Sequence, residues 1–374
     1  MRPLTVVLFA CLACASHLCA EEPAHAWPLL DGKETVAEYA KRVNLPPTKT
    51  LDLGNGVTLE LVLIPAGTFI MGTPEPVPVD EDAFRKRIVV GQALLAASVG
   101  TLLVMLAVVV IRAVRRKSWP QVSLSRLLVL TTVAGLGLYG GIHWRQAAQG
   151  LKQGLDEFEL AKARFANSEQ SEKPAHPVTL TKPFYMGKYE ITQAQYLQIQ
   201  GTNPCEFQGL NNPVEKVSWK DVGEFCQKAS AVTKEALRLP SEAEWEYACR
   251  AGTQRVYSSG DQEIDLDRVA WYGGNSNHST HPVGEKAPNG FGLYDMHGNV
   301  WEWCSDWFSE DYYATCPAVD PQGPASGQWR VLRGGSWNDY LRDCRVAYRI
   351  YDTPMYCFSN FGFRVVVEVP ARTP

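Results

Sequence analysis

The chain has 374 residues, of which 45% are hydrophobic and 20% are charged, and its formal net charge is −4. This length allows one large domain or two ordinary ones, with enough apolar residues for a buried core. The charge balance excludes a basic nucleic-acid-binding surface, and the hydrophobic fraction excludes a disordered chain. The 11 Trp, 15 Tyr, 30 Gly and 24 Pro residues indicate a loop-rich domain with aromatic walls.

The first 20 residues have the order of a secretory signal. Arg2 precedes an apolar run, and small residues follow that run before Glu21 and Glu22. We therefore predict that residues 1–20 are a signal peptide and that the main domain acts outside the cytoplasm. An uncleaved anchor is the alternative, although the run is short for crossing a bilayer.

Two longer apolar runs follow, at residues 88–111 and 127–144. Each meets the length of a transmembrane helix, and residues 112–126 between them carry five basic residues and no acidic one. Because positive charge stays on the cytoplasmic side, the pattern predicts two transmembrane helices joined by a cytoplasmic loop. The alternative is a buried helical hairpin in a soluble core. Residues 151–173 alternate charged and apolar positions and predict a helical stalk.

Local signals predict several smaller elements. Residues 35–44 favour a short amphipathic helix, and Gly54-Asn55-Gly56 between two apolar runs predicts a β-hairpin. Ser218 and Ser241 begin two capping boxes, and Gly252 is a natural end for the second helix. From residue 176 onward, short strands, tight turns and brief helices are expected to follow one another.

Eight short motifs occur in a fixed order along the chain. They run from Leu61 to Gly72, His176 to Leu180, Tyr185 to Gln193, Pro213 to Trp219, Arg238 to Arg250, Gly292 to Trp303, Arg333 to Trp337 and Asn360 to Arg364. In this order they resemble the formylglycine-generating enzyme family, also called the sulfatase-modifying factor family. The resemblance implies an α+β domain with a C-type-lectin-like fold and little regular secondary structure. Residues 27–73 would supply its first part and residues 174–370 its main part.

The resemblance also implies a metal site around a glycine-containing segment. The family's ligands fall here on the Asp295 side chain, the backbone carbonyls of Gly298 and Val300, and the Glu302 carboxylate. Carboxylates and backbone carbonyls suit a hard cation such as Ca²⁺. The alternative is structural: Asp295 caps a turn and Glu302 pairs with an arginine. The family's second calcium site is not expected, because Trp271 stands near the position of a required Asn.

The family's copper site, in contrast, is incomplete in this sequence. Family enzymes use two cysteines, spaced Cys-x₄-Cys after Gly-Gly-Ser, to convert a sulfatase cysteine to formylglycine with O₂. Counted from Ser336, Cys344 falls on the second cysteine and Asp339 stands in place of the first. Counted back from Arg349, the loop is shorter and Cys344 matches neither position. Because Cu(I) favours sulfur ligands, the two-thiolate copper site is absent on either count.

Cys344, with Ser336, is the candidate catalytic residue if the chain is an enzyme. Arg342 and Arg345 would lower the pKa of the Cys344 thiol and give it redox reactivity. The alternative is a structural or disulfide-bonded cysteine, as is common in exported domains. Seven cysteines follow residue 20, so at least one lacks a partner within the chain. The pairing is open, and Cys249–Cys344 is one option.

These observations lead to a first hypothesis and two alternatives. The first is a membrane-anchored, extracytoplasmic domain that binds calcium, lacks the copper site and acts in binding or partner recognition. The second is an oxidoreductase that oxidises a sulfatase cysteine, or another exported substrate, through Cys344. The third is a structural, membrane-linked protein without a ligand. Partners would be the membrane and an exported sulfatase, another protein or a glycan, and not a nucleic acid.

Overall fold

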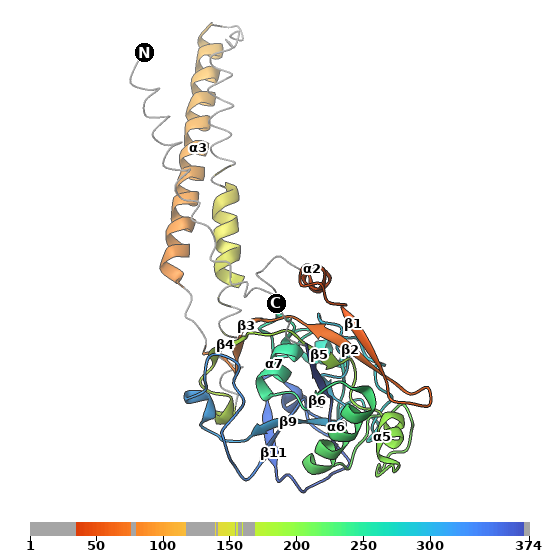
Figure 1. Ribbon diagram of the computed structural model, residues 1–374. Coiled ribbons are helices and arrows are strands. Elements are labelled where there is room, and N and C mark those ends of the chain that lie inside the picture. Colours follow the sequence, from red (N-terminus) through yellow and green to blue (C-terminus); the bar gives the residue numbers. More distant parts are fainter. Residues whose placement is uncertain are drawn as a thin grey trace. The chain divides into compact units, whose positions relative to one another are not determined.

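The computed structural model describes residues 35–75, 80–116, 139, 141–153, 155, 159 and 169–369. The chain divides into two compact units, one formed by residues 1–73 and 169–374 and the other by residues 74–168 (Figure 1). The predicted signal peptide at 1–20 lies outside the described residues. The first unit is therefore built from segments on both sides of the second unit in the sequence.

The second unit contains the long helix α3 (Glu81–Arg116), which includes the apolar run 88–111. Residues 141–153 are also helical. Among the described residues, however, no helix combines the length and hydropathy that crossing a membrane requires. The prediction of two transmembrane helices, at 88–111 and 127–144, is therefore not supported. Most of the second run lies outside the described residues, and the predicted loop at 112–126 begins within α3.

Two sheets form the centre of the first unit. A five-stranded antiparallel sheet has the order β1-β2-β5-β13-β6, and a four-stranded sheet has the order β11-β10-β9-β12, with β12 parallel to β9. Pairs β3·β4 and β7·β8 complete the described strands. The bounds are β1 Thr48–Asp52, β2 Thr58–Ile64, β3 Gly67–Met71, β4 His176–Leu180, β5 Phe184–Gly187, β6 Leu237–Arg238, β7 Ala270–Trp271, β8 His297–Gly298, β9 Trp301–Trp307, β10 Arg330–Arg333, β11 Arg349–Asp352, β12 Phe361–Gly362 and β13 Val366–Glu368.

Short helices surround these sheets. They are α2 Val36–Arg42, α5 Gln193–Gln200, α6 Trp219–Thr233, α7 Glu242–Arg250 and α8 Glu263–Asp267, with 3₁₀ turns at Gln170–Glu172, Tyr312–Ala314 and Leu341–Cys344. The predicted capping boxes are confirmed, because Ser218 and Ser241 each cap a helix and each pairs with an acidic residue three positions later. The second helix ends at Arg250, with Ala251 in the left-handed conformation just before Gly252.

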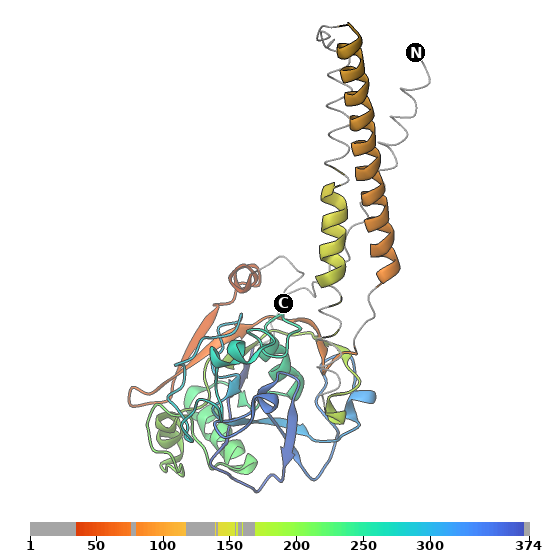
Figure 2. The same ribbon diagram turned by 180° about the vertical axis from the view of Figure 1, so that it is seen from behind.

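The hairpin around Gly54-Asn55-Gly56 is also confirmed. Strands β1 and β2 pair antiparallel across this turn, and the hairpin forms one edge of the first unit (Figures 1 and 2). Strand β2 then pairs with β5, which follows the inserted second unit in the sequence. Residues on both sides of the insertion thus share one sheet.

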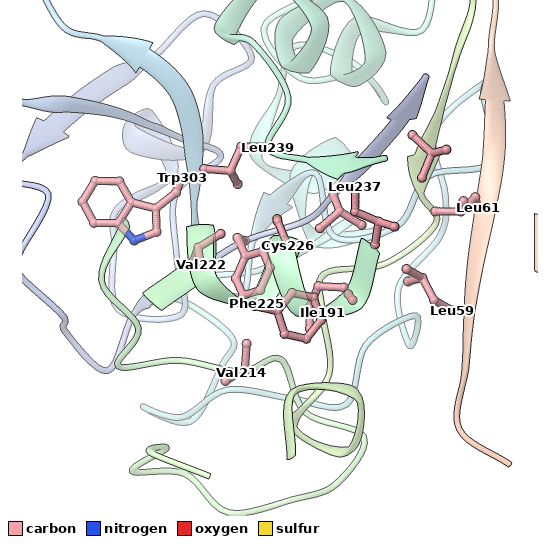
Figure 3. Packing of buried hydrophobic residues seen from close by; sticks show 14 of the residues in the cluster. Leu59, Leu61, Ile191, Val214, Val222, Phe225, Cys226, Leu237, Leu239 and Trp303 are labelled. Atoms are coloured by element: carbon pink, nitrogen blue, oxygen red, sulfur yellow. The ribbon is translucent and has the colours of Figure 1, made fainter. Parts of the chain in front are cut away.

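Both faces of the five-stranded sheet are buried. Along β2, Leu61 and Leu63 belong to one apolar cluster while Val62 and Ile64 belong to another, as expected where successive side chains point to opposite faces. Helix α6 covers the first face, where Phe225 packs among Val222, Leu237 and Ile191 (Figure 3). Helix α7 contributes to the second cluster with residues that include Trp245. Because both faces of this sheet are packed, the sheet supports the loops that connect its strands.

Buried ion pairs connect the segments beside the insertion to the rest of the unit. Arg345 forms two hydrogen bonds with the Glu172 carboxylate, at 2.8 and 2.7 Å. The Thr73 hydroxyl donates to the same carboxylate at 2.6 Å, and the Thr73 N–H donates to the Glu172 carbonyl at 3.2 Å. Deeper in the unit, Glu246 pairs with Arg250 and Arg333. Thr73, just before the inserted residues 74–168, is therefore held next to Glu172, which follows them in the sequence.

Candidate functional site

The segment from Asp295 to Glu302 is shaped by left-handed backbone conformations. Asp295, Gly298 and Asn299 have φ angles of 55°, 86° and 60°. A Cβ added to Gly298 would lie 2.0 Å from the carbonyl oxygen of Trp271, a distance that no real Cβ tolerates. Only glycine therefore allows β8 to lie beside β7 at this point. The segment then continues directly into β9.

Asp295 presents one free oxygen inside this segment. Its side chain is 2% exposed, and Oδ2 accepts a hydrogen bond from the Gly284 N–H at 2.7 Å. Oδ1 is buried and has no hydrogen-bond partner among the described residues. Burial raises the pKa of the Asp295 carboxyl to about 6. A buried oxygen without a partner is costly in a folded protein, so this atom is an indication of a bound group.

Glu302 is held by cationic and neutral donors. The Arg364 guanidinium donates to both carboxylate oxygens at 2.7 Å, and the Trp245 indole N–H donates to Oε2 at 2.8 Å. The sequence left open whether Glu302 pairs with an arginine, and the structure contains this pair. Because a carboxylate has about four acceptor positions, Oε1 of Glu302 can still accept one more ligand.

Glu190 is a third buried carboxylate beside the same segment. Its Oε2 accepts from the Asn299 side-chain amide at 2.7 Å, and its Oε1 accepts from the Val300 N–H at 3.1 Å. Burial, with further contributions from Asp295 and Glu302, raises the pKa of Glu190. Sequence reasoning missed this residue, because nothing near Glu190 in the sequence indicates a contact 110 positions away.

The residues of this segment offer oxygen donors of the kind that a calcium ion binds. Among the described residues, no group of three or more His, Cys, Asp or Glu side chains could hold a metal ion. A cation here would therefore depend on backbone carbonyls as well as side chains. The free Asp295 oxygen, the Gly298 and Val300 carbonyls and the Glu302 carboxylate form an oxygen-only set, which is the chemistry that Ca²⁺ prefers. Bound there, calcium would supply positive charge and cross-link the segment.

The loop after Gly334-Gly335 lies next to this segment. The Gly298 N–H donates to the Gly334 carbonyl at 2.8 Å, and the Trp337 N–H donates to the Asn299 carbonyl at 2.9 Å. The two candidate sites of the sequence analysis, the 295–302 segment and the Ser336–Cys344 loop, are thus hydrogen-bonded neighbours. A change in the conformation of one affects the backbone of the other.

Asp339, which the count from Ser336 places where the family carries its first cysteine, is fixed by hydrogen bonds. Its Oδ2 accepts from the Trp301 indole N–H at 2.8 Å and from the Ser336 hydroxyl. Asn360 also donates to the Ser336 hydroxyl, at 3.3 Å. Burial raises the pKa of the Asp339 carboxyl. Ser336 and Asp339 thus form a polar cluster with oxygen ligands and no thiol.

Cys344, at the end of the same loop, is fully buried. Burial, followed by the charges of Asp339 and Asp343, raises the pKa of its thiol well above the usual value. The expected lowering by Arg342 and Arg345 is wrong, because Arg342 pairs with Asp343 and Arg345 pairs with Glu172. A protonated, buried thiol is a poor nucleophile and a poor metal ligand.

The cysteines of the described part of the chain are all free thiols. They are Cys205, Cys226, Cys249, Cys304, Cys316, Cys344 and Cys357. The Cys249–Cys344 disulfide, which the sequence analysis named as one option, is therefore not formed. His297 contacts both residues: its Nε2 lies 3.7 Å from the Cys249 sulfur, and its Nδ1 donates to the Cys344 carbonyl at 2.8 Å. Burial lowers the pKa of His297 to about 4, so the imidazole is neutral near pH 7.

The fold is a mixed α/β domain with two central sheets and many loops, and its glycine-rich segments hold the candidate sites. The family model described as "Sulfatase-modifying factor enzyme 1-like domain" matches residues 151–369, more than half of the chain. The chain therefore belongs to the formylglycine-generating enzyme family.

Two relatives illustrate the range within the family. The chain is 46% identical to a formylglycine-generating enzyme of Streptomyces coelicolor over 169 residues, which are 41% of this chain and 52% of that enzyme. It is 30% identical to the chaperone protein LppX of Paenibacillus barcinonensis over 243 residues, covering 52% of this chain and 82% of that protein. The chain thus spans about half the length of the Streptomyces enzyme.

A solved structure has the same fold. Treponema denticola variable protein 1 matches with a TM-score of 0.58 and 24% sequence identity, over 87% of this chain and 100% of that protein. At this level of identity the likeness concerns the fold alone.

Proposed function

We propose that this chain is a binding or partner-recognition member of the formylglycine-generating enzyme family and not a copper oxidase. The observation that carries this proposal is the pair of residues at the family's copper position. Counted from Ser336, Asp339 stands in place of the first cysteine. It is hydrogen-bonded to Ser336 and Trp301, and the Cys344 thiol is buried. Since Cu(I) requires soft sulfur ligands, one buried thiol and one carboxylate make a poor site for it.

The names of two relatives support the proposal that some members of the family are enzymes and others act by binding. The Streptomyces coelicolor relative is a formylglycine-generating enzyme, whereas the Paenibacillus barcinonensis relative is a chaperone protein and is matched over 82% of its length. Chaperones act by contacting other proteins. We therefore propose an exported protein such as a sulfatase, or else a glycan, as the ligand, and a location outside the cytoplasm for the domain.

One calcium ion at the 295–302 segment is part of the same proposal. Its support is the buried Oδ1 of Asp295, which has no hydrogen-bond partner in the described part of the chain, together with the oxygen donors that the same segment carries at Gly298, Val300 and Glu302. Calcium would stabilise the segment that packs against the Ser336–Asp339 loop. Its role would be structural, because the loop itself carries the surface that a partner would contact.

A second candidate function is the oxidation of a substrate cysteine through Cys344. One test separates the two functions. The purified chain is incubated with a sulfatase-type Cys-x-Pro-x-Arg peptide, Cu(I) and O₂, and the peptide is examined by mass spectrometry beside an active family enzyme. An unchanged peptide supports the binding role. Conversion of the peptide thiol to an aldehyde, lost again in Cys344→Ser, would establish the oxidoreductase instead.

A further inference from the structure

The carboxylates beside the 295–302 segment outnumber the cations that contact them. Glu190, Asp295 and Glu302 are each at most 2% exposed, and Arg364 is the guanidinium that pairs with Glu302. The buried ion pairs of Glu172, Glu242 and Glu246 differ, because each of those carboxylates contacts an arginine directly. Buried charge without compensation is costly. Among the residues that the structure describes, no arginine pairs with Glu190 or Asp295, and a divalent cation would balance these two carboxylates.

Glu190 also controls the geometry of the segment. It accepts the Val300 N–H, while the carbonyl of the same peptide, that of Asn299, accepts the Trp337 N–H. Because a peptide group is planar, contacts at both of its ends fix its orientation. The carbonyls of Gly298 and Val300 flank this peptide on either side. Their directions therefore depend on the anchor that Glu190 provides.

The position of Glu190 itself is fixed by its neighbours. The Ile191 N–H donates to the Phe363 carbonyl at 2.9 Å, and the Val214 N–H donates to the Ile191 carbonyl at 2.8 Å. Ile191 is fully buried in the core (Figure 3). The Glu190 side chain thus extends from a rigid part of the chain toward the segment.

We propose that Glu190 is a further determinant of the cation site: it positions the Gly298 and Val300 carbonyls and supplies buried negative charge that a divalent cation balances. This inference rests on the calcium ion of the proposed function. It assigns a role to a residue outside the 295–302 segment, and it predicts that both the charge and the length of the Glu190 side chain matter.

The test measures cation binding directly. The full chain is stripped of metal by chelation and titrated with Tb³⁺, whose luminescence is excited through nearby indoles such as that of Trp301, and bound Tb³⁺ is then displaced with Ca²⁺. Thermal unfolding with and without Ca²⁺ gives a second readout. Two variants separate the two roles, since Glu190→Gln keeps the length without the charge and Glu190→Asp keeps the charge without the reach.

Glu215→Gln is the matched control. Glu215 is also a fully buried carboxylate that accepts two backbone N–H groups, those of Glu206 and Phe207, but it anchors a different loop. We expect both Glu190 variants to weaken Ca²⁺ binding by about tenfold or more, because a buried carboxylate that contacts Asn299 and Val300 is neutralised or moved. Glu215→Gln should change the unfolding temperature without changing the affinity for Ca²⁺.

The outcomes are distinct. If the native chain binds Ca²⁺ and Glu190→Gln binds it equally well, Glu190 has no role in the site and the calcium proposal still holds. If the native chain binds neither Tb³⁺ nor Ca²⁺, the calcium proposal and this inference both fail. If Glu215→Gln loses affinity as much as Glu190→Gln, the effect is one of general stability, and the specific role of Glu190 is overturned.

Discussion

The indole N–H of Trp301 donates a hydrogen bond of 2.8 Å to Oδ2 of Asp339. Trp301 begins β9 and lies within the 295–302 segment, next to Glu302, and Asp339 belongs to the loop that follows Gly334-Gly335. The contact therefore connects the 295–302 segment to the Ser336–Cys344 loop, the two candidate sites of this domain.

A cysteine at position 339 should not restore copper binding. We expect Asp339→Cys to bind Cu(I) no more tightly than the native chain, because the second sulfur, that of Cys344, is buried and protonated. Competition with a chromophoric Cu(I) chelator measures this affinity. Tight binding of one Cu(I) per chain would contradict the prediction and show that the loop can rearrange to expose Cys344.

The thiols should react with alkylating reagents according to their exposure. Cys357 is exposed, whereas Cys249, Cys304 and Cys344 are buried. We expect iodoacetamide to modify Cys357 in the native state about 100-fold or more faster than Cys344, since reaction of the latter requires local opening. Mass spectrometry of a time course gives the order. Fast labelling of Cys344 would indicate an accessible catalytic thiol.

Gly298 should be irreplaceable for a steric reason. In Gly298→Ala the new Cβ would meet the Trp271 carbonyl at 2.0 Å, so we expect a loss of about 3 kcal/mol or more in the free energy of unfolding. Gly292→Ala is the matched control, because Gly292 has a similar φ of 84° but no atom within 4 Å of the added Cβ. Urea unfolding should give a loss of only about 1 kcal/mol there. Equal losses would argue against the close approach.

Arg345 should contribute strongly to stability. Arg345→Ala leaves the fully buried Glu172 carboxylate without its cation, and we expect a loss of about 3 kcal/mol in the free energy of unfolding. Arg342→Ala serves as the control, because the Arg342 side chain is 72% exposed and its pair with Asp343 is worth little. The prediction is wrong if urea unfolding gives similar values for both variants.

Asp306 should make stability fall as the pH rises toward neutrality. Burial raises the pKa of this carboxyl from 3.8 to about 7, so between about pH 4 and pH 7 the folded state holds a proton that the unfolded state releases. The resulting stabilisation is present at the acidic end and lost as the pH passes the folded-state pKa. Asp306→Asn should flatten this dependence in urea unfolding, and the exposed Asp311→Asn should not. An unchanged slope in Asp306→Asn would contradict the assignment.

The sequence predicts the local features of this domain well. The hairpin around Gly54-Asn55-Gly56 and the helices that begin after Ser218 and Ser241 follow from turn and capping chemistry within a few residues. Such signals depend only on residues a few positions apart, so they can be recognised without knowledge of the tertiary structure.

The electrostatic environment of the candidate site could not be predicted in the same way. The pKa of the Cys344 thiol depends on burial and on the partners of Arg342 and Arg345, and Arg345 is paired with a residue 173 positions earlier in the chain. Glu190 likewise contacts a peptide 110 positions away. The presence of Arg342 and Arg345 near Cys344 in the sequence does not show which carboxylates these arginines pair with. Only the three-dimensional structure shows those partners.

The meeting of Thr73 and Glu172 has a consequence for how the chain can be altered. Because these two residues are hydrogen-bonded to each other, residues 74–168 are an insertion that leaves the first unit and returns to it at neighbouring positions. A short linker could replace residues 74–168, and closing a shorter loop costs less conformational entropy than closing the native one. Evolution could thus gain, lose or exchange this segment while the order of strands in the sheets stays the same.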